Sequence, residues 1–262
     1  MAWCGRAQPC SEIRKNGRHE REQPRHRDAE ERGVPEQGTA ASVQEGHSMS
    51  TTIVQGAEVE DYPEIPPEAR RGRAMRVTEI GEAVLHERCA DVTAFGTDEL
   101  RTLVDDMFAT MLVAEGVGLA ANQVDVNLRL FVYDLTDTDG TRYVGHVANP
   151  EVEVTSSETE ETEEGCLSVP GPGADLFRPL DVRLRGVDIT GAPVEMTAHG
   201  YLARCFQHET DHTNGRLYVD LLSKRIRKRV LRDMEHLREE VLERRESVSR
   251  MHEKEPVTYP ER

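Results

Sequence analysis

Residues 207–215 read QHETDHTNG, in which two histidines stand four positions apart and a glutamate directly follows the first. The surrounding stretch, residues 201–213, is predicted to be an α-helix. Positions four apart lie on one helix face with Cβ atoms about 5–6 Å apart, so His208 and His212 can direct ring nitrogens at one metal ion. Glu209 would project beside that ion, where a general base acts on water. A helix that binds no metal is the alternative.

The identity of a third ligand bears on this choice. Metalloproteases with the HExxH motif take another Glu or His from further along the chain. Glu235 and His236 stand downstream, but they fall on the charged face of a predicted amphipathic helix. Cys166, in the segment EGCLS over residues 164–168, is the better candidate, because a divalent metal deprotonates a coordinating thiol. A buried structural cysteine is the alternative at this position.

A segment rich in small residues, GVGLAANQ, occupies residues 116–123. Its glycines and alanines allow close approach to another backbone or to a ligand. The segment is not a phosphate loop, because no Lys-Ser/Thr pair ends it and no strand directly precedes it. It predicts a tight loop in which Asn122 and Gln123 make a side-chain amide available as a hydrogen-bond donor.

The segments GVGLAANQ, EGCLS and QHETDH, in this order, resemble the three signature motifs of the peptide deformylases. The resemblance covers residues 75–247 and is closest to the type found in high-GC Gram-positive bacteria. It implies an α+β fold, with antiparallel β-sheets around the motif helix, a further helix on its N-terminal side and a long C-terminal helix. It also implies a hydrolase that removes the formyl group from the N-terminal formylmethionine of new polypeptides and releases formate.

The resemblance assigns roles to particular residues. Cys166, His208 and His212 correspond to the metal ligands, with a fourth position left for water, and Glu209 corresponds to the general base. One divalent ion per chain is implied. The family favours Fe(II), which Ni, Co or Zn can replace, and Cys/His₂ ligation itself suits Zn and Fe alike.

The resemblance also implies how the substrate is held. The side chain of Gln123 and the backbone N–H of Leu167 correspond to the two donors to the oxyanion. Gly118, with Val117 before it, corresponds to the backbone that pairs with the substrate peptide.

An apolar slot for a methionine side chain is expected beside the metal. Tyr201 and Cys205 lie seven and three residues before His208, so helical spacing brings them near its face, and they are the candidates for the slot walls. Ordinary core packing is the alternative for both.

Two charged residues outside the motifs match the family. Arg178 and Glu115 are expected to pair and support the site, with ordinary surface charges as the alternative. The chain departs from many members at Thr213, where they have Leu, and at Gly173, where several have Arg. These departures put contacts with the downstream peptide in doubt, but not the chemistry.

Apolar periodicity predicts the other elements. Spacings of three and four over residues 98–114 indicate an amphipathic helix capped by Thr97 or Asp98. A second long helix is expected over residues 221–241. The segment 151–164 carries seven acids and no base, which predicts a mobile loop with a short strand at its start, over residues 151–154. Strands are predicted at residues 128–135, 143–150, 181–189 and 193–200, with a turn over 136–141 between the first two.

Composition divides the chain into three parts. Residues 1–48 contain no Leu, Phe or Tyr, and residues 1–74 are expected to be a disordered extension. Met49 and Met75 are plausible start codons besides Met1, so an artefact of the assigned gene start is the alternative for part of the extension. The catalytic domain is expected over residues 75–250, and residues 251–262 are expected to be a frayed tail.

The charge and cysteine content limit the class of protein. A formal net charge of −16 argues against general binding to a phosphate backbone, and hence against DNA as a partner. No apolar run approaches the roughly 20 residues that cross a bilayer, and no signal peptide is recognisable. Five scattered cysteines argue against a disulfide framework and for a reducing cytoplasm.

A basic stripe, residues 223–232, is the exception to the acidic balance. It predicts either a solvated helix face or docking to ribosomal RNA near the exit tunnel, because the family acts on nascent chains. Two other functions compete with deformylation: a zincin-type peptidase with a downstream ligand, and a binding module that kept the site without turnover.

Overall fold

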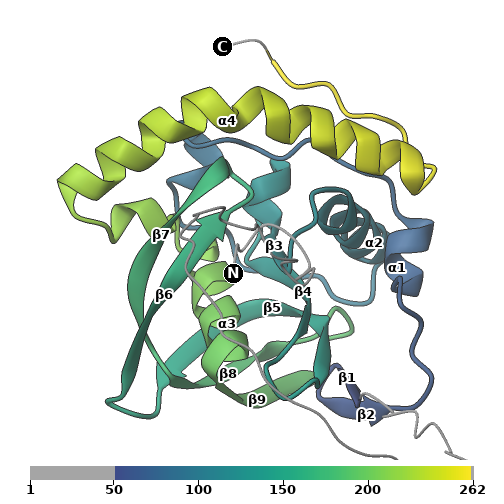
Figure 1. Cartoon of the computed structure of the whole chain (residues 1–262). Coiled ribbons are helices and arrows are strands. Elements are labelled where there is room, and N and C mark those ends of the chain that lie inside the picture. Colours follow the sequence, from purple (N-terminus) through teal and green to yellow (C-terminus); the bar gives the residue numbers. More distant parts are fainter. Residues whose placement is uncertain (1–50, 261–262) are drawn as a thin grey trace, which may run out of the picture. The chain divides into compact units, whose positions relative to one another are not determined.

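The computed structural model describes residues 51–260, and the remaining residues, 1–50 and 261–262, lie outside this range (Figure 1). Its strands are β1 (Thr52–Val54), β2 (Ala57–Val59), β3 (Gly118–Ala120), β4 (Leu130–Thr136), β5 (Arg142–Val154), β6 (Thr159–Cys166), β7 (Val169–Pro179), β8 (Asp181–Val187) and β9 (Pro193–His199). Its α-helices are α1 (Pro67–Arg71), α2 (Asp98–Val113), α3 (Gly200–Thr213) and α4 (Lys224–Met251), and its 3₁₀ helices are η1 (Ala83–Leu85), η2 (Ala121–Val124) and η3 (Tyr218–Asp220).

Most strands form one mixed sheet, in which β2, β1, β5, β4 and β3 lie in that order and β8 and β9 continue from β5. All of these pairs are antiparallel except β1 with β5. An irregularity between Ala148 and Glu151 divides β5, so that its first part pairs with β4 and its last part with β8. The second sheet is the β6–β7 hairpin. The expected α+β fold with largely antiparallel sheets is confirmed.

The helix α3 lies in the middle of the fold, against β3, β4, β5, β8 and β9 of the large sheet, and it also contacts β7 (Figure 1). Its apolar face packs into the sheet through Phe206, whose ring centroid lies 6.1 Å from that of Phe131 and 5.2 Å from that of Tyr133. All three rings are fully buried. The core therefore holds the motif helix in a fixed position relative to the large sheet.

The two flanking helices form where the apolar spacing predicts them. The side chain of Thr97 accepts a hydrogen bond from Leu100 N and caps α2, as expected. Ser223 caps α4 in the same way at Ile226 N. The helix α4 is longer than predicted and ends at Met251, and it packs across β7 and α2 (Figure 1). None of the described helices combines the length and the apolarity needed to cross a membrane.

Residues 51–74 are ordered, in contrast to the predicted disorder, and the earlier part of that prediction lies outside the described residues. β1 extends the sheet beside β5, and α1 packs against α2. Gly72, the residue after α1, lies so close to the backbone of α2 that a Cβ at this position would be 1.9 Å from Asp105 O. Arg142 also donates to the carbonyl oxygens of Pro63 and Glu64. These contacts could not be predicted from the low apolar content of the segment, because backbone groups make many of them.

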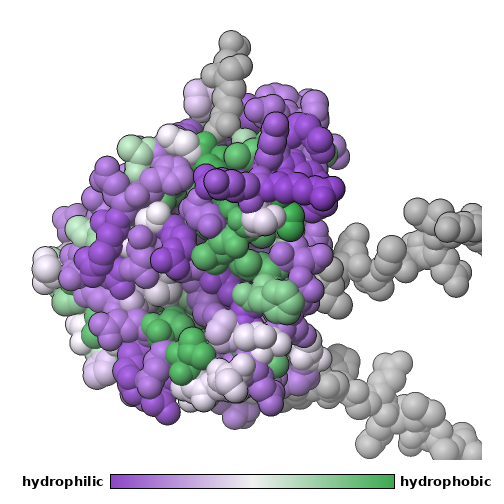
Figure 2. Space-filling model, turned by 90° about the vertical axis from the view of Figure 1, so that its left-hand side faces the viewer, coloured by the Kyte–Doolittle hydropathy of each residue, from purple (hydrophilic) through white to green (hydrophobic). Residues whose placement is uncertain are grey.

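The acidic segment 151–164 is largely β-strand, so the predicted mobile loop is wrong, whereas the short strand predicted at its start is confirmed. Its first residues continue β5 to Val154, and β6 begins at Thr159 and pairs with β7. The acids on β6 are largely exposed except Glu164, which is fully buried. The face that bears this hairpin is mostly hydrophilic, with hydrophobic side chains in separate patches (Figure 2).

Residues 252–260, after α4, are held in place and are not frayed as predicted, while the last two residues of the predicted tail lie outside the described range. It turns back along α4 (Figure 1). The carbonyl oxygen of Pro260 accepts a 2.9 Å hydrogen bond from Arg238, and the hydroxyl of Tyr259 accepts one of 3.2 Å from Arg245.

Candidate metal centre

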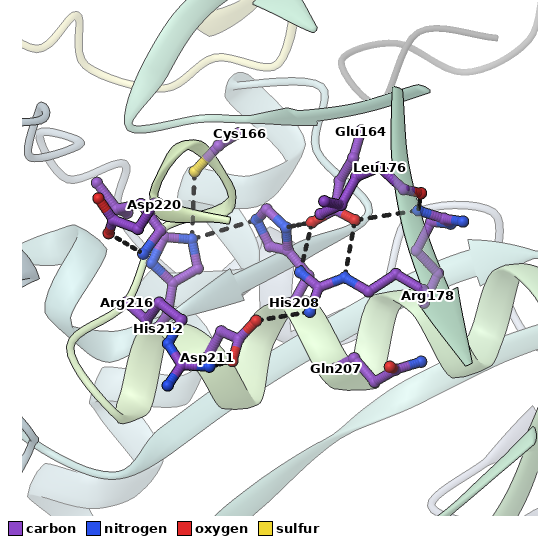
Figure 3. A network of polar contacts seen from close by, with 12 residues as sticks. Glu164, Cys166, Leu176, Arg178, Gln207, His208, Asp211, His212, Arg216 and Asp220 are labelled. Atoms are coloured by element: carbon purple, nitrogen blue, oxygen red, sulfur yellow. Dashed lines mark hydrogen bonds and ion pairs between the residues drawn. The ribbon is translucent and has the colours of Figure 1, made fainter. Parts of the chain in front are cut away.

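Three side chains that can ligate a metal meet beside α3 (Figure 3). Cys166 ends β6, and α3 carries His208 and His212. The Sγ of Cys166 lies 3.2 Å from Nε2 of His212, and that nitrogen lies 3.2 Å from Nε2 of His208. One ligand atom from each residue lies within 4.8 Å of the other two, and all three residues are buried. The structure thus brings together the three residues that the sequence predicts as ligands.

These donor atoms fit a divalent metal. One sulfur and two imidazole nitrogens suit zinc and iron(II) alike. The Nδ1 of His208 is bound to Glu164, which leaves its Nε2 for the centre. Burial, with a contribution from His208, lowers the pKa of His212, and this favours the neutral imidazole that binds metals.

Glu164 is the hub of the network behind the ligands (Figure 3). Because a carboxylate only accepts, Nδ1 of His208 donates to its Oε1, at 2.6 Å. Arg178 donates two bonds to the same carboxylate, at 2.8 and 3.1 Å, and Arg204 donates one at 3.2 Å. Burial opposes ionisation of Glu164, but the bonds from His208 and Arg178 outweigh it and hold the pKa of Glu164 well below its ordinary value. Such a carboxylate fixes the ring orientation and tautomer of a ligating histidine.

Glu209 lies in the same site with an unused oxygen. It is buried, and its Oε2 has no hydrogen-bond partner within the described part of the chain. Burial, together with the charge of Glu164, raises the pKa of Glu209 to about 7 against the opposing effect of His208. Gly118 lies directly against this carboxylate, because a Cβ on Gly118 would be 2.4 Å from Oε1 of Glu209. A buried carboxyl group with a pKa near neutrality suits proton transfer in both directions.

Gln123 points its amide nitrogen into the centre. Its Oε1 accepts a 2.8 Å bond from Ala120 N, which fixes the orientation of the amide. Its Nε2 lies 3.2 Å from the hydroxyl oxygen of Ser168 and 3.6 Å from Sγ of Cys166. Leu167 occupies the turn between β6 and β7, and its side chain is buried against Gly116.

The two candidates for the side-chain slot lie on the inner face of α3. Cys205 is fully buried, with its Sγ 4.0 Å from the carbonyl oxygen of Val117. Tyr201 is partly buried and packs against the same core as Cys205. Val117 also lines a cavity of about 360 Å³ between α2 and the end of α4, but neither Tyr201 nor Cys205 lines that cavity.

The expected pair between Glu115 and Arg178 is wrong, because each has another partner. Arg178 binds Glu164 and also donates a 2.6 Å bond to Asp211. Glu115 binds Arg244 on α4. Arg178 therefore does support the ligands, but through Glu164.

Glu164 and Arg204 are site residues that the sequence analysis missed. Both were present in the segments already singled out: Glu164 is two positions before Cys166, and Arg204 is one helical turn before His208. An arginine one turn before a ligand, within the otherwise apolar stretch of residues 201–206, was the available signal, because a buried charge requires a partner.

The model of the family described as polypeptide deformylase matches residues 74–228, which is more than half of the chain. The chain belongs to the polypeptide deformylase family. Members are metal-dependent hydrolases that remove the N-terminal formyl group from newly made polypeptides, so this chain is an enzyme of that class.

Individual relatives agree with the family assignment. Peptide deformylase 1 of Streptomyces avermitilis is 51% identical over 167 residues, which are 63% of this chain and 77% of the relative. A peptide deformylase structure from Legionella pneumophila aligns with a TM-score of 0.58 and 40% identity, over 63% of this chain and 96% of the other. A deformylase structure from Acinetobacter baumannii with bound Met-Ala-Ser aligns with a TM-score of 0.54 and 35% identity, over 57% of this chain and 98% of the other. The resemblance to an actinobacterial type is confirmed.

Proposed function

We propose that this chain hydrolyses the formyl group of N-terminal formylmethionine with Cys166, His208 and His212 as the ligands of one divalent metal and Glu209 as the general base. The observation that carries this proposal is the meeting of one thiol and two imidazoles, from β6 and α3, around a common point. The unpartnered Oε2 of Glu209 supports the assignment of the base.

When bound, a divalent metal supplies Lewis acidity and lowers the pKa of water from about 15.7 toward about 7. Glu209 takes a proton from the attacking water as its oxygen adds to the formyl carbon. The former carbonyl oxygen then carries negative charge, and the Gln123 amide and the Leu167 N–H donate to it. Glu209 returns the proton to the amine nitrogen as the C–N bond breaks. The products are formate and a peptide with a free α-amino group.

The substrate peptide is proposed to pair with the backbone at Gly118 and Val117. The strand β3 is at the end of its sheet, which supports this role, because an edge strand can take an added strand. A Cβ at position 118 would meet Glu209, so glycine keeps the reacting end of the peptide close to the base. Tyr201 and Cys205 are the proposed walls of the methionine slot. The Acinetobacter relative with bound Met-Ala-Ser supports a peptide ligand.

Iron(II) is proposed as the metal, with nickel, cobalt or zinc as replacements. The donor set accepts all of these ions, so the preference for iron rests on the family alone. Metal analysis after anaerobic purification tests it. Zinc in stoichiometric amount and no iron would contradict the assignment.

The catalytic domain is proposed to span residues 51–260, wider than the 75–250 predicted, because β1 pairs with β5, α1 packs on α2 and Tyr259 and Pro260 bond to α4. The enzyme is proposed to act in the cytoplasm. Cys89, Cys166 and Cys205 are free and buried, which supports a reducing compartment.

The start of α4 is proposed to contact ribosomal RNA. Residues 224, 225, 228 and 229 are basic and exposed, which supports phosphate contacts that weaken as salt rises. Ribosome co-sedimentation at low salt should fall when these four residues are replaced by glutamine. Replacing the exposed Glu239 and Glu240 by glutamine is the matched control. Equal sedimentation of the basic-to-glutamine variant and the wild type would refute the contact.

Formate release from a formyl-Met peptide, with Fe(II) or Ni(II) supplied, tests the function. Glu209→Ala should keep the metal and lose turnover, and Cys166→Ser should lose the metal. A zincin-type peptidase would keep its metal in Cys166→Ser and cut internal peptide bonds. A binding module would release no formate, and wild-type turnover in Glu209→Ala would exclude the assigned base.

A further inference from the structure

A buried arginine on α4 reaches the turn that carries one of the proposed oxyanion donors. Arg245 is 4% exposed, and its Nη2 donates a 2.8 Å hydrogen bond to the carbonyl oxygen of Leu167. The helix and the turn are 78 residues apart in the sequence. Arg245 also lies beyond the residues 74–228 that match the family.

The burial of Arg245 is not explained by an ion pair. Within residues 51–260, no carboxylate lies within ion-pair distance of its guanidinium, and its Nε has no hydrogen-bond partner. By contrast Arg238, two helical turns earlier on α4, binds the buried Glu79 at 2.9 Å. Burying an arginine without a carboxylate partner is unfavourable. The hydrogen bond to Leu167 O is therefore the main interaction that offsets the free-energy cost of burying Arg245.

The C-terminal segment holds the arginine from the other side. The hydroxyl of Tyr259 accepts a 3.2 Å bond from Nη1 of Arg245, and the guanidinium carbon lies 5.8 Å from the centre of the Tyr259 ring. The same hydroxyl lies 3.4 Å from Val77 N. The next residue of the turn is also fixed, because Ser168 O accepts a 2.9 Å bond from Ile80 N.

We propose that Arg245 is a positioning residue for deformylation, with Tyr259 as its support. Each peptide unit is rigid, and the units before and after Leu167 share its Cα. Holding the Leu167 carbonyl therefore restricts how the preceding unit, with the Leu167 N–H, can rotate. A donor fixed in this way needs no reorganisation when charge develops on the formyl oxygen. This inference rests on the proposed function, since it assigns Arg245 to the oxyanion donor of that reaction.

The test compares variants of the full-length, metal-loaded chain. Arg245→Met removes the donors and keeps much of the side-chain volume. We expect kcat to fall between about 10-fold and 100-fold, because a misplaced donor stabilises the transition state less well. KM and the metal content per chain should change less than about two-fold. Arg245→Lys, which can still donate to Leu167 O, should recover part of the loss. Arg250→Met, on the exposed face of α4, should match the wild type.

Tyr259→Phe keeps the ring but loses the hydroxyl, so it tests the support even if Arg245→Met does not fold. Losing one hydrogen bond of about 1 kcal/mol predicts a fall in kcat of about five-fold. Amide hydrogen exchange gives a second readout. Exchange at residues 166–168 should rise in the Arg245 and Tyr259 variants, while exchange in α3 should stay as in the wild type.

The outcomes separate the two proposals. If the wild type releases formate and the variants keep its kcat, or lose activity only in proportion to lost metal, the positioning role is refuted. If the wild type releases no formate, the proposed function fails. The positioning role in that reaction fails with it, and amide exchange then tests only the underlying restraint: faster exchange at residues 166–168 in the variants supports a hold of Arg245 on the turn, and unchanged exchange refutes it.

Discussion

The Oε1 of Glu164 lies 2.6 Å from Nδ1 of His208, one of the three candidate metal ligands. Arg178 and Arg204 donate to the same carboxylate, so two guanidinium groups compensate one buried negative charge. The ring of His208 is therefore fixed by a group that is itself fixed from two sides. This relationship ties metal affinity to residues that do not touch the metal.

Glu164→Gln should weaken metal binding while the ligands stay in place. Loss of a carboxylate behind a ligating histidine typically lowers metal affinity by about 10-fold to 100-fold. The affinity is measured by competition with a chromogenic chelator. Glu163→Gln, at the neighbouring and partly exposed position on β6, is the control and should match the wild type. Equal affinities for both variants would show that Glu164 does not tune the centre.

Gln123→Glu should separate the two roles of the Gln123 side-chain amide, which accepts from Ala120 N and is proposed to donate to the oxyanion. The new carboxylate still accepts from Ala120 N, so the local backbone is retained, but it cannot donate to an oxyanion. Removing one such donor typically lowers kcat by about 10²–10³-fold. Steady-state kinetics of formate release measure it, with metal content determined on the same sample. A kcat within a factor of three of the wild type would exclude Gln123 as a donor.

Gly118→Ala should impair the base without removing the metal. The added Cβ would lie 2.4 Å from Oε1 of Glu209, so the carboxylate must move. A displacement of about 1 Å at a catalytic group can lower turnover by about 100-fold. Gly140→Ala is the control, because its turn has a positive φ but open space around the site of the Cβ. The control should lose stability and keep its kcat, and a wild-type kcat for Gly118→Ala would mean that Glu209 tolerates the shift.

The meeting of the three candidate ligands could be predicted because much of their pattern is local. His208 and His212 share a helix face by spacing alone, and the hydrophobic periodicity that predicts α2 and α3 also follows the short-range geometry of a helix. Cys166 could be proposed because its segment completes an ordered set of motifs. None of these predictions required knowledge of which strands pair.

The support around the ligands could not be predicted, because it depends on tertiary contacts. Glu164 looks like one more acid in an acidic segment until β6 pairs with β7 and buries it. Arg245 looks like part of a solvated helix face, because α4 carries charges on every turn. The wrong partner for Arg178 has the same origin, since long charged side chains have many candidates in sequence and one set of neighbours in space.

The burial of the His146 ring predicts that the protein loses stability in mild acid. Burial lowers its pKa from 6.5 to about 4, against a weaker opposing effect of Asp188, and its Nε2 lies 3.1 Å from Nε2 of Gln55 and 3.3 Å from Ile189 N. The unfolded chain binds this proton near pH 6.5, whereas the folded chain binds it only near pH 4. The contribution of neutral His146 to the free energy of unfolding is therefore fully present above pH 6.5. It is lost as the pH falls from about 6.5 to about 4, by at most about 3 kcal/mol.

Denaturant unfolding of the wild type and His146→Gln at several pH values measures this loss. The difference between the two proteins cancels the contribution of the metal ligands, which also bind protons in acid. The difference in free energy of unfolding between the wild type and the variant should shrink as the pH falls from about 6.5 to about 4. Parallel stability curves over this range would show that His146 does not titrate as described.

A chain that begins at Met49 should be more stable than a chain that begins at Met75. A chain that begins at Met75 lacks β1, β2 and α1, and with them the contacts of Ile65 and Ala69 with the core around α2. It also loses the carbonyl oxygens that accept from Arg142. Ile65 is partly buried and Ala69 carries one methyl group, so their lost burial suggests a loss on the order of 2 kcal/mol, or about 4–8 °C in Tm. Calorimetry of both metal-loaded proteins measures the difference. Equal Tm values would mean that residues 51–74 add no stability, and their contacts with α2 and β5 would then need another explanation.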